Sequence, residues 1–259
     1  MDFTISKRAY SRKSFMHHYR FFPKEGDLFC RITIPYSADG NATRLISVGV
    51  STIYAGDMTL GRGPARSRLF KHLGIEQKRV LALIQSHGKS VRIIDGDTDA
   101  LIPGDGALTT DRSIVLSVTV ADCLPVYLYD PFKEVFALVH SGWKGTGIAE
   151  NAVEMMVGKF SCRPGDISAV IGPGIGACCY DVPAERAHIL GAYGPGVSEL
   201  RGDQYFLSLQ KANIRILEDN GIRAISLVDQ CTSCSSFFGS YRRQGAQGFT
   251  RMVAVIGFF

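Results

Sequence analysis

Two histidines and one cysteine stand directly after short apolar runs rich in valine and isoleucine: His87, Cys123 and His140. Such runs predict strands, and strand ends are rigid positions from which side chains can converge. Two imidazoles and one thiolate suit Zn²⁺, and copper is also admissible. Three protein ligands leave the fourth tetrahedral position open, which is typical of a catalytic site. A lone His or Cys at a strand end is usually a core residue, so the prediction rests on the three together.

The same residues allow a different chemistry. A cysteine beside a histidine can act as a nucleophile, so Cys123 and His140 could form a thiol–imidazole pair for acyl transfer or deamidation. Asp122, next to Cys123, either orients a ligating histidine as a hydrogen-bond acceptor or caps a turn. Both readings of Asp122 stay open at this point.

The remaining cysteines are expected to be reduced thiols. The chain has seven cysteines, an odd number without the spacing of a small disulfide scaffold. Cys231 and Cys234 have the spacing of half a zinc knuckle, but no second pair completes it, so we expect a buried, reduced pair behind the active loop. The glycine-rich segment 172–176 lacks a dinucleotide-binding context and predicts a tight loop that carries Cys178, Cys179 and Tyr180 toward the site.

The elements that must position these residues are mostly strands. Helical patterns are few, so a mixed or antiparallel sheet is expected rather than a wholly parallel one, within an α/β or α+β class. The predicted strands are Leu45–Val50, Val80–Ile84, Ile114–Val120, Val126–Tyr129, Val135–Val139, Ala169–Ile171, Ile222–Val228 and Met252–Ile256, and the predicted helices are Pro64–Leu73, Ile148–Phe160 and Leu209–Asp219.

Charge and hydropathy limit the classes of function. Lysine and arginine exceed aspartate and glutamate by 29 to 24, and part of the excess lies in residues 1–27, which we predict to be a basic N-terminal tail before a single domain at 28–259. Neither nucleic-acid nor membrane binding is indicated. The N-terminus lacks the apolar core of a signal peptide, so a cytoplasmic protein is expected.

The motifs around the three ligands resemble those of a known family. They stand as QSHG, ADCLPV and HSGWKGT, with spacings of 36 and 17 residues between ligands. These are similar to the signature of the laccase-domain proteins, also described as the YfiH-type purine nucleoside phosphorylase family. The segments IGPGIGACCYDV, CTSC and FFGSYRR extend the resemblance, which covers about residue 44 to the end.

The resemblance implies a layered α/β/β/α sandwich with mixed sheets in a single domain. It also implies phosphate-dependent cleavage of adenosine, inosine or S-methyl-5'-thioadenosine, with adenosine deamination as a further activity, at a zinc site. The expected metal ligands are His87, Cys123 and His140, and the expected catalytic residues are Cys123, His140, Arg68, Cys179 and Arg242, with Tyr180 as a further site candidate.

The sequence also departs from the family pattern. Ser67 replaces an asparagine beside Arg68, which leaves substrate preference less defined than metal binding. Lys144 replaces the arginine of the HxGWRG motif, and a lysine cannot make the bidentate oxyanion contacts of a guanidinium.

Three other functions stay open. One is a copper-dependent polyphenol oxidase, although the sequence holds only six histidines and such oxidases need many. The second is the Cys–His hydrolase or deamidase described above. The third is a metal-stabilised binding module without activity.

Overall fold

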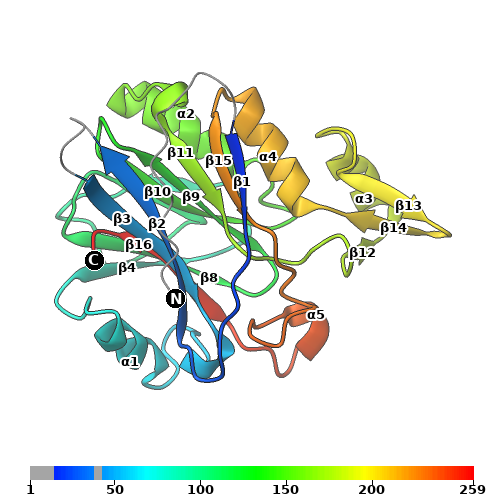
Figure 1. Ribbon diagram of the computed structural model, residues 1–259, viewed down its shortest axis with the longest axis horizontal. Coiled ribbons are helices and arrows are strands. Elements are labelled where there is room, and N and C mark those ends of the chain that lie inside the picture. The colour runs from blue at the N-terminus through cyan, green and yellow to red at the C-terminus, as the bar shows by residue number, and fades with distance from the viewer. Residues whose placement is uncertain (1–14, 38–42) are drawn as a thin grey trace.

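The computed structural model describes residues 15–37 and 43–259 and builds them into three sheets and five α-helices (Figure 1). The strands are β1 (Phe15–Tyr19), β2 (Phe29–Ser37), β3 (Thr43–Ser51), β4 (Arg79–Ile84), β5 (Val91–Ile93), β6 (Leu101–Pro103), β7 (Gly106–Thr109), β8 (Ile114–Val120), β9 (Leu124–Asp130), β10 (Val135–Ser141), β11 (Ser168–Ile171), β12 (Asp181–Val182), β13 (Ser198–Arg201), β14 (Gln204–Leu207), β15 (Ala224–Val228) and β16 (Met252–Gly257). The helices are α1 (Ala65–His72), α2 (Ile148–Phe160), α3 (Ala184–Gly191), α4 (Leu209–Asp219) and α5 (Tyr241–Gln244).

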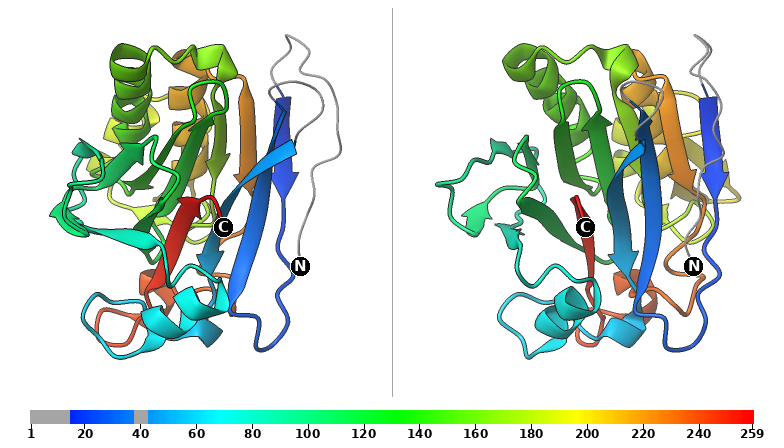
Figure 2. Two further views of the ribbon diagram at one scale, coloured as in Figure 1. Left: turned by 90° about the vertical axis from the view of Figure 1, so that its left-hand side faces the viewer. Right: turned by 60° about the vertical axis from the view of Figure 1, so that its left-hand side comes forward.

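Two large sheets face each other across the centre of the molecule (Figure 2). One has the order β1-β15-β11-β9-β10-β7-β5 and the other β2-β3-β16-β8-β4-β6, while β12-β14-β13 form a small third sheet. In the six-stranded sheet β8 pairs parallel with β4 and antiparallel with β16, and in the seven-stranded sheet β11 pairs parallel with β15 and antiparallel with β9. The prediction of mixed sheets is confirmed.

The alternation of side chains along β9 explains the layering. Val126 and Leu128 pack with the helices, whereas Tyr127 and Tyr129 point into the core between the two sheets. Successive side chains of a strand point to opposite faces, so a strand that is apolar at every position must be covered on both sides. β9 is buried at all seven positions.

Helices cover the outer face of each large sheet. α2 places Ala152, Val153 and Met156 against the seven-stranded sheet, in one core cluster with residues of α4. α1 packs Ala65 and Leu69 against the outer face of β8 and β16 in the other sheet. The order is therefore helix, sheet, sheet, helix, which confirms the predicted α/β/β/α sandwich.

All eight predicted strands and all three predicted helices are present, and α2 and α4 have the predicted bounds. The predicted tail, 1–27, contributes β1, which pairs parallel with β15, and its residues 1–14 lie outside the described residues. Within the described part of the chain, no helix has the length and apolar character needed to cross a bilayer.

Candidate active site

The three predicted ligands come together where the two large sheets meet. His87 follows β4, Cys123 lies in the link from β8 to β9, and His140 lies near the end of β10. One nitrogen or sulfur atom from each of the three lies within 4.8 Å of those of the others. The rings of His87 and His140 meet edge to face, with centroids 4.9 Å apart. The convergence that the sequence predicts is present in the structure.

The fully buried carboxylate of Asp105 holds two of these ligands in place. Its Oδ1 accepts hydrogen bonds from the backbone N–H of His87 at 2.8 Å and from Nδ1 of His140 at 3.1 Å, and its Oδ2 accepts from Gly88 N–H at 2.8 Å. This fixes the orientation of the His140 ring and leaves Nε2 for a ligand. His87 has a φ of 62°, a conformation that costs about 1–3 kcal/mol and is held by the bond to Asp105.

Asp122, which the sequence offered as the residue orienting a histidine, does not do so. Its carboxylate accepts hydrogen bonds from Thr232 Oγ1 at 2.7 Å and from the backbone N–H of Arg242 at 2.7 Å, at the start of α5. The orienting role is therefore wrong for Asp122 and belongs to Asp105. Asp122 instead ties the C-terminal segments to the site.

Hydrogen bonds, opposed by burial, set the charge of the site. Burial raises the pKa of the Cys123 thiol, but hydrogen bonds from His140 and His87 outweigh it and bring the pKa down to about 7. Burial lowers the pKa of His140, but its hydrogen bonds with Asp105 and Cys123 outweigh that effect and raise the pKa to about 9. A substantial share of Cys123 is therefore the thiolate near neutral pH, the form of cysteine that binds metals and attacks electrophiles.

Position 142, in the segment HSGW, accepts only glycine. A Cβ there would lie 2.7 Å from Cys123 Sγ and 3.9 Å from Cδ2 of His87. Any side chain at this position would displace the sulfur from the other two ligands. The glycine of the motif is explained by this close approach.

A cavity of about 620 Å³ opens onto the three ligands. Three guanidinium groups line it, those of Arg186, Arg242 and Arg251. Four aromatic side chains line it as well: Trp143, Tyr180, Tyr241 and Phe249. The guanidinium groups can bind an anion and the aromatic faces can stack on a planar ring, next to the His-Cys-His cluster.

Arg186 and Arg251 were not identified from the sequence. The Arg186 guanidinium carbon lies 4.2 Å from the centre of the Trp143 ring, Nη1 donates to Tyr180 Oη at 3.4 Å, and Nε is buried with no protein partner. Arg251 stacks on Phe249 at 4.1 Å. Because α3, which carries Arg186, was not predicted, no spacing argument could connect it to the site.

Of the other predicted site residues, some line the cavity and some do not. Arg242 lines the cavity, but its guanidinium donates to the carbonyls of Cys179 at 2.9 Å and Asp181 at 3.1 Å and pairs with the Asp181 carboxylate. Tyr180 lines the cavity, whereas Cys179 does not. Arg68, on α1, is also not among the lining residues.

The two residues that depart from the family motif, Ser67 and Lys144, do not line the cavity. Ser67 is exposed on α1. Its neighbour Arg66 is half-buried and has a structural role, because it donates to Met58 O at 3.0 Å and to Ser117 Oγ at 3.1 Å. Lys144 places its ammonium group 5.5 Å from the centre of the Trp143 ring and does not line the ligand cavity.

The expectation for Cys231 and Cys234 is wrong on two points. Cys234 is exposed and Cys231 half-buried, so they are not a buried pair. A second pair, Cys178 and Cys179, lies beside them, and all four sulfur atoms are within 4.8 Å of one another. Residues 178 and 231 are far apart in sequence, so only the fold brings the pairs together.

The layered fold and a His-Cys-His cluster facing a cavity define a single-domain α/β protein with an enzyme-like site. Residues 46–258 match the family described as "Multi-copper polyphenol oxidoreductase laccase", and the chain belongs to this family.

Two curated relatives carry a common name. The chain is 34% identical over 212 residues to "Purine nucleoside phosphorylase YlmD" of Geobacillus stearothermophilus, covering 74% of this chain and 77% of that protein. It is also 34% identical over 149 residues to mouse "Purine nucleoside phosphorylase LACC1", covering 53% of this chain. The match spans only 35% of the mouse protein's length.

Solved structures share the fold. The crystal structure of YlmD from Geobacillus stearothermophilus superposes with a TM-score of 0.74 at 30% identity, covering 90% of this chain and 99% of that chain. The structure of the hypothetical protein YfiH from Bacillus licheniformis gives a TM-score of 0.75 at 28% identity, covering 83% and 93%. The predicted family and fold are confirmed.

Proposed function

We propose that this chain is a purine nucleoside phosphorylase that cleaves adenosine, inosine or S-methyl-5'-thioadenosine with phosphate. The observation that carries the proposal is the joint placement of the His-Cys-His cluster, three guanidiniums and four aromatic rings around one cavity. YlmD of Geobacillus stearothermophilus, which shares the fold, is named a purine nucleoside phosphorylase. Because the chain spans only part of some of its relatives, the assignment to this chain is our proposal.

We assign the metal of the site as zinc, held by His87, Cys123 and His140. Two imidazole nitrogens and one sulfur are a donor set that zinc prefers, and the thiol of Cys123 favours the thiolate form. A zinc ion with three protein ligands supplies Lewis-acid chemistry at its open coordination position. Asp105 contributes by fixing the ring of His140.

The side chains of the cavity suit the two substrates. Arg186 and Arg251 line the cavity, and their guanidinium groups can make charge-assisted hydrogen bonds to phosphate oxygens. Tyr180 and Tyr241 offer aromatic faces for a purine. In the reaction, a phosphate oxygen forms a bond to C1' of the ribose, the C1'–N9 bond breaks, and its electron pair leaves with the base, which takes up a proton.

A product assay tests the proposal. Purified chain is incubated with adenosine, with and without phosphate, and adenine, hypoxanthine, inosine and ribose 1-phosphate are quantified. We expect ribose 1-phosphate in an amount equal to the sum of free adenine and hypoxanthine, all formed only when phosphate is present. Adenine with free ribose, independent of phosphate, would contradict phosphorolysis, and no turnover of any nucleoside would leave a metal-stabilised binding module as the better description.

Arg186→Gln is expected to weaken phosphate binding more than nucleoside binding. The loss of one charge-assisted contact corresponds to about 1.5–3 kcal/mol, or a rise of about 10- to 100-fold in the KM for phosphate. Arg163→Gln, which removes an exposed guanidinium paired with Asp166, is the matched control and should leave this KM unchanged. An equal change in both KM values would show that Arg186 does not select the phosphate.

We also propose adenosine deamination as a secondary activity of the same cavity. Water would add to C6 of the purine and ammonia would leave, giving inosine without phosphate. A metal ion held by His87, Cys123 and His140 would supply the required Lewis acid. Inosine in the product assay, at a rate independent of phosphate, would support this activity, and its absence would remove it.

One observation favours a second candidate, a cysteine hydrolase or deamidase. Cys123, His140 and Asp105 form a continuous hydrogen-bonded series, with the thiol pKa brought down to about 7 as burial is outweighed by hydrogen bonds from the histidines. Such a series can activate a nucleophile. Iodoacetamide labelling of Cys123 in both metal-free and zinc-loaded chain would favour the nucleophile, whereas labelling only without zinc would favour ligation.

A copper-dependent polyphenol oxidase fits this donor set less well. Multicopper oxidases need several copper centres rich in histidine. Among the described residues, the two groups of candidate metal ligands contain only two histidines, His87 and His140. Oxygen consumption with a phenol after copper loading, compared with nucleoside turnover, separates the two activities. We expect nucleoside turnover and no phenol oxidation. We further propose that the protein is cytoplasmic, that residues 28–259 form the catalytic domain, and that its partners are small-molecule substrates.

A further inference from the structure

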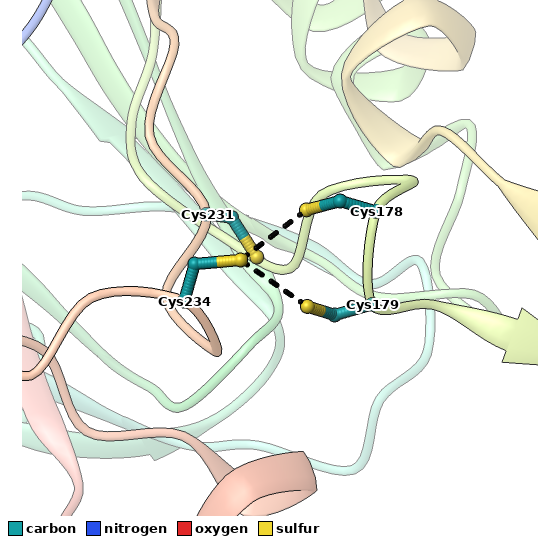
Figure 3. A group of neighbouring side chains, drawn as sticks. All are labelled: Cys178, Cys179, Cys231 and Cys234. Carbon is teal, nitrogen blue, oxygen red and sulfur yellow. Dashed lines mark hydrogen bonds between the residues drawn. The ribbon is translucent and has the colours of Figure 1, made fainter.

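Four cysteines from two distant segments meet outside the cavity described above. Cys178 and Cys179 lie in the loop between β11 and β12, and Cys231 and Cys234 lie in the loop that follows β15. In Figure 3 the two pairs approach from opposite sides and their sulfur atoms point toward one another. A β-bridge between Gly174 and Cys231 holds the two loops side by side.

The spacing of the sulfur atoms matches a tetrahedral metal site. Four sulfurs at about 2.3 Å from a central zinc ion are separated by about 3.8 Å along each edge of the tetrahedron. Here Cys234 Sγ lies 3.5 Å from Cys178 Sγ and 3.3 Å from Cys179 Sγ, and no pair of sulfurs among the four is more than 4.8 Å apart. An ion at the centre requires only small side-chain adjustments.

The backbone of the first loop is fitted to the sulfurs. Gly176 N–H donates to Cys231 Sγ at 3.2 Å, the type of outer hydrogen bond that supports metal-bound thiolates. A Cβ at position 176 would lie 3.1 Å from Cys231 Cβ and 3.2 Å from Cys178 Sγ. Glycine at this position therefore allows the loop to approach close enough for all four sulfurs to converge.

The charge around the cluster is complementary to a tetrathiolate. Four thiolates around one Zn²⁺ carry a net charge of about −2. Three guanidiniums are anchored on the two loops: Arg201 donates to Ala177 O at 3.0 Å, Arg242 to Cys179 O at 2.9 Å, and Arg243 to Ser233 O at 3.0 Å. Arg201 is also paired with Glu199 and Arg242 with Asp181, so Arg243, whose guanidinium donates to backbone carbonyls, contributes most of the positive charge that stabilises such an anion.

We propose that Cys178, Cys179, Cys231 and Cys234 form a second metal site, a structural tetrathiolate for Zn²⁺. Four protein ligands leave no open position, so the ion would have no catalytic role. It would tie the β11–β12 loop, which carries Tyr180 of the cavity wall, to the loop after β15. Cys178 and Cys234 are exposed, which gives the ion a route of entry.

Metal stoichiometry of selected variants tests the second site separately from the first. Elemental analysis of reduced, zinc-loaded chain should give about two zinc ions per wild-type chain and about one for the double variant Cys178→Ser/Cys234→Ser. Cys123→Ala should also retain about one, now at the four cysteines. Cys162→Ser changes a cysteine buried in another part of the core and should leave the stoichiometry as in wild type.

Cobalt substitution distinguishes the two sites by spectroscopy. Sulfur-to-cobalt charge-transfer absorption should keep the intensity of four thiolates in Cys123→Ala and fall to about a quarter of it, from the single thiolate of Cys123, in Cys178→Ser/Cys234→Ser. If the Cys123→Ala chain bound no metal, the second site would be contradicted. If the wild-type chain bound a single zinc ion, and that ion lay at the four cysteines, the proposed catalytic metal would be contradicted. The two proposals can thus fail independently.

Alkylation of the wild-type chain gives a readout that needs no variant to fold. Peptide mapping after iodoacetamide treatment should show these four cysteines reacting at least about tenfold more slowly with zinc than after chelation, because metal-bound thiolates are shielded. Equal rates with and without zinc would overturn the proposal. An intact mass lowered by disulfide formation in freshly purified, zinc-supplemented chain would also overturn it.

Discussion

Replacing Cys123 by alanine is expected to remove the metal from the His-Cys-His site and to reduce phosphorolysis about 1,000-fold or more. Lewis-acid stabilisation by a bound metal contributes several kcal/mol to a transition state, and each 1.36 kcal/mol corresponds to about tenfold in rate. The sulfur is one of only three ligand atoms and lies within 4.8 Å of both others. Metal content and the initial rate of ribose 1-phosphate formation are measured on the same preparations.

Two further variants and one control sharpen this experiment. His87→Ala and His140→Ala should behave like Cys123→Ala, because each removes one ligand of the same site. Cys30→Ser, at a buried position of β2 that does not line the cavity, controls for the loss of a thiol. If a ligand variant depleted of metal at this site turned over nucleoside at the wild-type rate, the metal would have no part in the mechanism.

Asp105→Asn is expected to weaken zinc binding about 10- to 100-fold, although Asp105 is not itself a ligand. Both carboxylate oxygens accept N–H donors, from His87 and His140 on one side and from Ser86 and Gly88 on the other. An asparagine must turn its own NH₂ group toward one of these two sets of N–H donors. That set would then have no acceptor. In one orientation the ring of His140 and the left-handed backbone of His87 lose their acceptor, and in the other Ser86 and Gly88, on either side of His87, lose theirs.

The measurement is zinc affinity by competition with a chelator, together with the melting temperature in the metal-free state. One unsatisfied buried donor costs about 1–3 kcal/mol, so the metal-free variant should also melt at a lower temperature. Asp203→Asn, an exposed carboxylate, is the matched control and should change neither quantity. Unchanged zinc affinity in Asp105→Asn would show that the three ligands are positioned without this carboxylate.

The convergence of His87, Cys123 and His140 could be predicted from the sequence because each lies at or just after the end of an apolar strand. β8 runs over the seven predicted residues, Ile114–Val120, and its end fixes where the segment carrying Cys123 begins. Strand ends of this kind are recognisable without knowledge of tertiary contacts. The same reasoning gave α2 and α4 their correct bounds, because their apolar faces repeat with helical spacing.

Asp105 could not be found in this way. It precedes β7, a strand of four residues with no alternating pattern, and its contact with His140 depends on the pairing of Gly106 with Val139 in the sheet. Register between strands far apart in the sequence is a tertiary property. A buried aspartate between two glycines was the only local signal.

Arg186 and the cysteine cluster were missed for related reasons. α3, which carries Arg186, has only two buried residues, Ala187 and Leu190, so its amphipathic pattern is too short to predict a helix. The approach of Cys178 to Cys234 depends on how two loops pack, and loops have no periodicity to read. The arginine inferred from the family motif, Arg68, is not among the residues that line the cavity.

The most direct test of the central claim is a zinc titration of metal-depleted Cys178→Ser/Cys234→Ser chain, with ribose 1-phosphate formation from adenosine and phosphate followed at each step. We predict that activity rises in proportion to zinc and reaches its plateau at about one ion per chain, because only the His-Cys-His site remains. Full activity before any zinc is added, or zinc binding at this site without any ribose 1-phosphate, would contradict the account.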